Sequence, residues 1–198
     1  MAVVSLKYKS KQGTLTAPGD VDPGAMIPIA TTTLSTSTAT VTFSNIPQVY
    51  EHLQIRVWGY NTSGSDRSLE YAFNSNTSAV YTNHFLLGSG SAASAGAGTS
   101  RNYAYTFDTN SGQRGFNGDS TKASVFIIDI LDYANTNKNK TVRALGGWDG
   151  NGSGYIGLAS NLWASTSAID RIDFTVPYSS FFGANTTFAL YGIKRAGA

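Results

Sequence analysis

The chain has 198 residues, of which 41% are hydrophobic, 12% aromatic and only 13% charged; this composition supports one packed domain and excludes a disordered chain. A net charge of +2 argues against nucleic acid as the main partner, because phosphate binding needs a concentrated basic face. The absence of cysteine excludes disulfides and thiolate metal sites, and no apolar run is long enough to span a membrane.

The first 24 residues differ in character from the rest. They carry scattered glycine and proline, including two Pro-Gly pairs, before any regular pattern begins, so we expect an extended arm at 1–24 and a single domain at 25–198. Charge near the start leaves no room for the apolar segment of a signal peptide. Lys7, Lys9 and Lys11 lie on one side of an extended chain. They fit either a solvated, edge-protecting strand or a tether to an acidic neighbouring surface.

Apolar and polar residues alternate with a period of two along much of the domain, which is typical of half-buried antiparallel strands. The segments with this pattern are residues 38–44, 52–58, 69–73, 169–176 and 187–193. Residues 123–131 are more continuously apolar. They predict a central strand covered on both faces, although a buried helix gives the same signal.

Turn residues separate these segments, and two regions are expected to be irregular. Residues 47–51 favour a short helical turn, and residues 88–100, rich in Gly, Ser and Ala, favour a flexible loop. Many short strands with such punctuation predict an all-β fold, a sandwich or a barrel.

Candidate general bases are few. His52 opens a predicted strand, and His84 follows Thr82-Asn83; neither belongs to a nucleophile elbow or to a zinc-type His pair. We therefore interpret both histidines as structural or surface residues and expect no catalytic residue.

Two pairs of aspartates invite comparison with glycosidases, which need two carboxyl groups across a sugar-binding cleft. Asp129 with Asp132 and Asp170 with Asp173 are each spaced i, i+3, and on an extended strand that spacing points the side chains to opposite faces. Arg171 follows Asp170, and basic residues follow Asp132. Ordinary ion pairing is the interpretation we favour.

The segment from Asp149 to Gly154 reads DGNGSG and matches the first half of a calcium-binding loop. The bidentate Glu expected at its twelfth position is replaced by Ser160, and the flanking segments alternate like strands. Asp-Gly and Asn-Gly are hairpin residues. The segment therefore predicts a hairpin turn without a metal, and we expect no cofactor.

Aromatic side chains are the remaining candidates for binding. Three tryptophans and eleven tyrosines could form a sugar-stacking platform, or they could pack in the core and in cross-strand pairs. Trp148, just before the glycine-rich turn, and Tyr155, just after it, are the candidates for exposed glycan contacts.

Several stretches resemble a family of structural proteins from the virions of tailed phages, especially phages of cyanobacteria and other aquatic bacteria. The similar segments are Met26–Leu34, Val41–Gln48, His52–Arg56, Asp129–Arg143, Asn151–Gly154, Leu162–Ile169 and Phe188–Lys194. Together they span most of residues 26–194. Members of this family are called head decoration, fibre or structural proteins.

The resemblance implies an antiparallel β-sandwich of jelly-roll type and no enzymatic residues. It leads us to expect a capsid decoration or cement subunit, assembled in the bacterial cytoplasm and located in the virion. On symmetry grounds it would be a homotrimer that contacts other phage proteins, with no role for nucleic acid or membrane. The alternative is a tail fibre or receptor-binding module that recognises host glycans. A glycoside-cleaving enzyme is the third, contrasting hypothesis.

Overall fold

The structure is a computed structural model that describes residues 24–107 and 115–195. Lys7, Lys9 and Lys11, with nearly all of the predicted arm, lie outside the described residues. The regular elements within them are twelve strands. They are β1 (Met26–Thr33), β2 (Thr40–Phe43), β3 (His52–Gly59), β4 (Glu70–Phe73), β5 (Tyr81–Gly88), β6 (Ala93–Arg101), β7 (Ala104–Tyr105), β8 (Ser124–Ile130), β9 (Lys140–Asp149), β10 (Gly154–Trp163), β11 (Ile172–Thr175) and β12 (Thr187–Ile193). Within the described ranges, no helix has the length and apolar character needed to cross a membrane.

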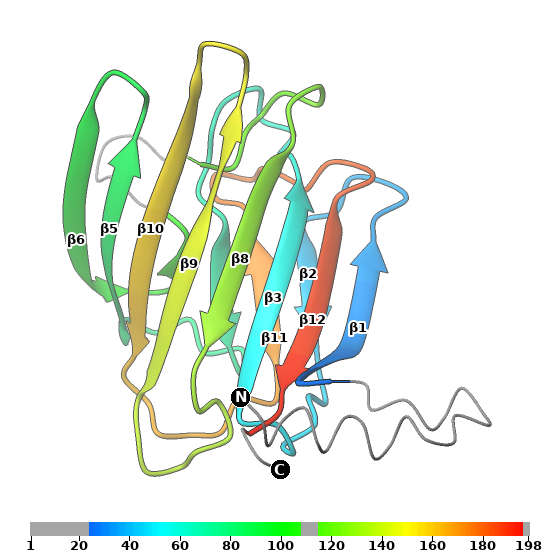
Figure 1. Cartoon of the computed structure of the whole chain (residues 1–198), viewed down its shortest axis with the longest axis vertical. Coiled ribbons are helices and arrows are strands. Elements are labelled where there is room, and N and C mark those ends of the chain that lie inside the picture. The colour runs from blue at the N-terminus through cyan, green and yellow to red at the C-terminus, as the bar shows by residue number, and fades with distance from the viewer. Residues whose placement is uncertain (1–23, 108–114, 196–198) are drawn as a thin grey trace, which may run out of the picture.

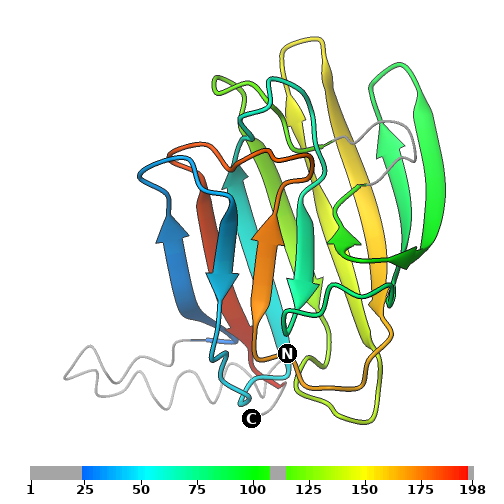
Figure 2. The same ribbon diagram turned by 180° about the vertical axis from the view of Figure 1, so that it is seen from behind.

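The strands form two sheets that pack face to face. The large sheet has eight strands in the order β1-β12-β3-β8-β9-β10-β5-β6, and the small sheet has four in the order β2-β11-β4-β7. Figure 1 shows the large sheet in front, and Figure 2 shows the small sheet against its other face. All pairings between the named strands are antiparallel. The predicted antiparallel β-sandwich is thus confirmed.

The core lies between the two sheets and consists of the inward residues of the alternating strands. In β3, Leu53, Ile55 and Val57 are buried, and the residues between them face outward. Phe174 of the small sheet lies 5.1 Å, centroid to centroid, from Phe188 of the large sheet. Burying one such aromatic side chain contributes roughly 1.5–3 kcal/mol. One continuous cluster of buried residues therefore joins both sheets.

The prediction of a flexible loop at residues 88–100 is wrong for most of its length. Residues 93–101 form β6, which pairs with β5 along its length. Small side chains are required there because a Cβ at Gly96 would lie 2.6 Å from the ring of Phe85. Backbone pairing and this close packing outweigh the weak strand propensity of glycine and alanine.

The predicted helical turn at 47–51 is also wrong, since these residues form non-helical turns and bends. Side-chain bonds organise this segment instead. The Tyr133 hydroxyl donates to the Pro47 carbonyl, and the Gln48 amide donates to the carbonyls of Ile46 and Ile169 at 2.8 and 2.9 Å.

Residues 124–130 do form a central strand, β8, but only its inner face is covered. Phe126, Ile128 and Ile130 are buried, whereas Val125 on the other face is 51% exposed. The expectation that this strand is covered on both faces is therefore wrong in this chain.

Candidate functional site

The outer face of the large sheet, turned away from the small sheet, carries a cluster of apolar side chains that are exposed or, for Ile127, partly exposed. We call this cluster the apolar patch; it comprises Trp58, Leu86, Val125, Ile127, Leu145, Ile156 and Leu158. Ile156 is 68% exposed and Leu86 is 60% exposed. From these exposed fractions we estimate roughly 600 Å² of apolar surface, at the upper end of what a monomer normally shows.

Strand register brings the members of the patch together from five strands. In one row across the sheet, Leu86, Leu158, Leu145 and Ile127 are successive partners on β5, β10, β9 and β8. Directly opposed residues of neighbouring strands have Cβ atoms about 4.5–5.5 Å apart. These side chains therefore form one continuous surface.

A second row runs beside the first and contains two glycines among larger apolar residues. Its successive partners are Gly88, Ile156, Gly147, Val125 and Trp58. Gly88 leaves open space beside Ile156, since an added Cβ there would meet nothing closer than 3.9 Å. A surface groove of about 730 Å³ is lined by residues of this row, Gly147 included, and by the β9–β10 hairpin. The outer face is thus grooved as well as apolar.

Beyond the Leu86 row, toward the other end of the strands, the face becomes polar. The next row contains His84, Ser160, Arg143, Asp129 and Gln54 as successive partners. Gln54 donates to the Asp129 carboxylate at 2.9 Å. The outer face is therefore divided along the strands into an apolar half and a polar half.

The predicted hairpin turn at Asp149–Gly154 is confirmed, and it connects β9 with β10 at the top of Figure 1. The Gly150 N–H donates to the Ser153 carbonyl at 2.7 Å. Asn151 and Gly152 adopt φ values of 58° and 103°, the left-handed conformations such turns require. The Asp149 carboxylate accepts the N–H of Asn151 at 2.8 Å, so it supports its own turn.

Trp148 and Tyr155, the candidate glycan contacts, are brought together as a cross-strand pair with ring centroids 6.1 Å apart. Both are only partly exposed. The Trp148 indole donates to Asp66 at 3.3 Å, and the Lys122 ammonium lies 5.8 Å from its ring. These contacts tie the hairpin to neighbouring loops. The two other tryptophans differ, since Trp163 is buried in the core and Trp58 is 53% exposed on the outer face.

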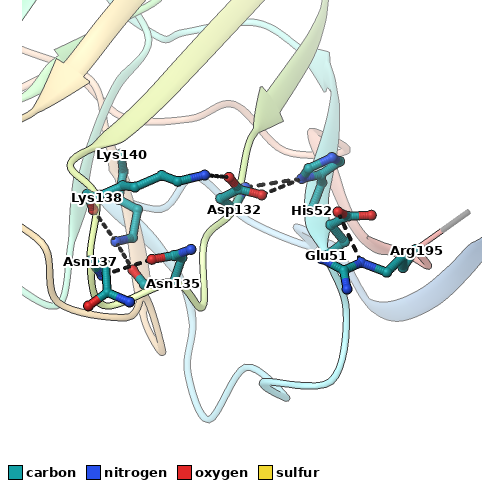
Figure 3. Close-up of polar contacts among 8 residues, drawn as sticks. All are labelled: Glu51, His52, Asp132, Asn135, Asn137, Lys138, Lys140 and Arg195. Atoms are coloured by element: carbon teal, nitrogen blue, oxygen red, sulfur yellow. Dashed lines mark hydrogen bonds and ion pairs between the residues drawn. The ribbon is translucent and has the colours of Figure 1, made fainter.

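Glu51, His52 and Asp132 are the only group of acidic and histidine side chains, within the described part of the chain, placed closely enough to hold a metal ion. Figure 3 shows that each already has partners. Asp132 pairs with Lys138 at 2.8 Å, and Glu51 pairs with Arg195 at 3.4 Å. The Asp132 backbone N–H donates to Nδ1 of His52 at 3.0 Å.

The hydrogen bond from Lys138 holds the pKa of the Asp132 carboxyl below its usual value, with the charges of Lys138 and Arg195 acting in the same direction. The carboxylates are thus neutralised by cations, and His52 anchors the turn after β8. The cluster is best described as an ion-pair network. The sequence pointed to His52 and Asp132 but not to Glu51, because the contact depends on how two loops meet.

Lys140 is a buried lysine that the sequence did not single out. Its ammonium donates to the backbone carbonyls of Asn135, Lys138 and Thr166. Burial holds the pKa of this ammonium below its ordinary value, while the charge of Asp132 opposes that effect. Three carbonyl acceptors compensate for the lost water. Lys140 therefore serves to fix the polar loop between β8 and β9.

Ion pairing, the favoured interpretation of the aspartates, is found for Asp132 and Asp173. Arg171 contacts Asp173, two residues away, at 2.7 Å rather than pairing with the adjacent Asp170. Thr42 also donates to Asp173 at 2.7 Å. Asp129 lies on the outer face of the large sheet. His84 is also on the outer face, where it is exposed.

Comparison with known proteins adds little to these observations. No protein-family model matches the chain, and no curated protein matches it. Among solved structures, one similar chain is a protein of unknown function from Shewanella oneidensis MR-1. It is 12% identical, the match covers 90% of this chain and 80% of that one, and the TM-score is 0.20. This likeness carries no argument about function.

Proposed function

We propose that the protein is a non-enzymatic structural subunit of a tailed-phage virion, most simply a capsid decoration or cement protein. The observation that carries the proposal is the apolar patch, a shaped and exposed surface on a rigid sheet. Such a patch is typical of proteins that work by contacting other proteins. The resemblance of the sequence to phage virion proteins, with the jelly-roll topology that it implies, supports the same conclusion.

The attachment to the shell is assigned to residues 1–24. The trio Lys7, Lys9 and Lys11 gives this segment a local positive charge that suits an acidic partner surface. The attachment would weaken as salt screens these charges.

The alternative function is a tail-fibre or receptor-binding module that recognises host glycans. The observation that favours it is the Trp148–Tyr155 pair at the rim of the groove. Both rings are committed to contacts within the chain, and the surface next to them is apolar. A protein partner fits that surface better than a sugar does.

Particles that lack the protein provide the test. Full-length protein and a variant without residues 1–24 would be added at low and high salt, and occupancy would be measured by labelling and electron microscopy. We expect full-length protein to occupy the capsid at low salt and the truncated protein to fold but stay in solution. Label found only at the tail would contradict the decoration role. Equal occupancy by both forms would contradict the role assigned to the arm.

A further inference from the structure

We propose that the apolar patch binds a second copy of this chain, face to face, about a two-fold axis that runs parallel to the strands over the seam between β9 and β10. Rotation about this axis keeps the strand direction and turns the sheet over. Consequently β10 of one copy faces β9 of the other, β5 faces β8, and β6 faces β3. Sheets packed in this aligned way lie about 10 Å apart.

The sizes of the side chains match under this operation. In the glycine-containing row, Ile156 faces Gly147 of the second copy and Val125 faces Gly88 of the second copy. At the end of the row, Trp58 faces Ala93 of the second copy. In each of these three pairs a large residue faces a small one, and the two-fold axis repeats every pair once. The groove beside Ile156 becomes the socket for the same residue of the second copy.

The neighbouring row is matched differently, because all of its central members are large. Leu158 faces Leu145 of the second copy, and Leu86 faces Ile127 of the second copy. These pairs form an apolar layer like the interior of a β-sandwich. They lie beside the interlocking row and complete the dry centre of the interface.

The polar half of the face is complementary in charge. Asp129 faces His84 of the second copy, and Arg143 faces Ser160 of the second copy. An imidazole N–H donates to a carboxylate in either protonation state, and an Arg guanidinium donates to a hydroxyl. Within one copy, Asp129 and Arg143 are themselves cross-strand neighbours. No like charges are brought together in this row, so it fixes the register of the two copies.

The area is also sufficient for a stable pair. Each copy contributes roughly 600 Å² from the apolar patch, and the polar row adds to this, so the total exceeds the roughly 1,000–1,200 Å² that specific interfaces need. An isologous contact uses the same patch twice and closes after two copies. The proposal does not depend on the phage assignment, since it concerns self-association in solution.

Gly88 offers a sharp test because a larger residue fits there in the single chain. A Cβ at this position would approach nothing closer than 3.9 Å, and its backbone is outside the left-handed region. Gly88→Leu would add apolar surface but fill the hollow that receives Val125 of the second copy. If the face associates only through non-specific hydrophobic contacts, this change should strengthen association. If it forms the interlocking dimer proposed above, the change should weaken association.

Sedimentation equilibrium of the full-length chain measures this directly. We expect the wild-type protein to have twice the chain mass of 21.0 kDa. For Gly88→Leu we expect the dissociation constant of the dimer to rise roughly tenfold or more. The matched control is Thr31→Leu, which makes the outer face more apolar on β1, beyond the overlap of the two copies, and should leave dimerisation unchanged.

Ile156→Asp should give a monomer that is folded by circular dichroism. A wild-type monomer, the homotrimer expected from the resemblance, or unweakened association of Gly88→Leu would overturn the proposal. If the protein forms this dimer but does not occupy the capsid in the particle experiment described above, only the virion role is contradicted.

Discussion

The two faces of the large sheet are built from the same strands but differ in what covers them. On β8, Phe126 faces the small sheet and is fully buried, while its neighbour Val125 faces outward and is 51% exposed. On β9, Val142 is buried and Leu145 is 45% exposed. The inner face holds the fold together. The outer face carries apolar residues that are exposed in the single chain and that the proposed dimer would bury.

The largest expected effect is a difference in unfolding free energy between a substitution on the inner face and one on the outer face. Phe126→Ala should lower the free energy of unfolding by about 3–5 kcal/mol, because it removes buried surface and leaves a cavity between the sheets. Leu158→Ala should change the stability of the monomer by less than about 1 kcal/mol, because the side chain is already 54% exposed. Chemical denaturation at a concentration that keeps both proteins monomeric checks this.

The core substitution should leave the affinity between copies unchanged in molecules that fold, whereas the outer substitution should weaken it. Equal losses of stability from Phe126→Ala and Leu158→Ala would show that the outer face also supports the fold. The comparison between the two faces would then fail.

A smaller effect is expected at the polar end of the sheet, where Asp132 pairs with Lys138. The hydrogen bond from Lys138 lowers the pKa of Asp132 in the folded state below its ordinary 3.8. The stabilisation is therefore present above the unfolded-state pKa and lost as pH falls through the lower folded-state value. Because both side chains are substantially exposed, we expect Asp132→Asn to cost only a few tenths of a kcal/mol at pH 7.

Thermal unfolding of wild-type protein and Asp132→Asn between pH 7 and pH 2 measures this difference. The two curves should converge at the acid end. Lys138→Met is the matched control, since it removes the same pair from the other side. A gap that widens toward low pH would contradict the assigned sign.

Part of the fold could be predicted from the sequence. Alternation in residues 52–58 and 187–193 located β3 and β12, because in each strand every second residue is buried and most of the residues between them are at least partly exposed. The Asp-Gly and Asn-Gly signals located the β9–β10 hairpin. β6 was missed because Ala, Gly and Ser carry no alternating pattern, and their pairing with β5 depends on packing around Phe85.

The candidate surface was less accessible to sequence analysis. The continuous apolar pattern of residues 123–131 was interpreted as a strand covered on both faces, yet the Val125 side chain is exposed to solvent. Leu86, Leu145 and Ile156 come from three different strands, and only register places them side by side. Lys140 has the appearance of an ordinary surface lysine in a polar run. Its burial depends on three carbonyls that the loop brings together.

Site-specific cross-linking tests the pairing of the outer faces most directly, because the natural chain has no cysteine. His84→Cys and Asp129→Cys would be made as two separate proteins, mixed, and treated with a short bismaleimide. In one chain these positions are three strands apart, roughly 14 Å, but across the proposed two-fold axis they face each other. We expect a covalent dimer from the mixture and little from either protein alone. Equal cross-linking in all three samples, or none in the mixture, would contradict the account.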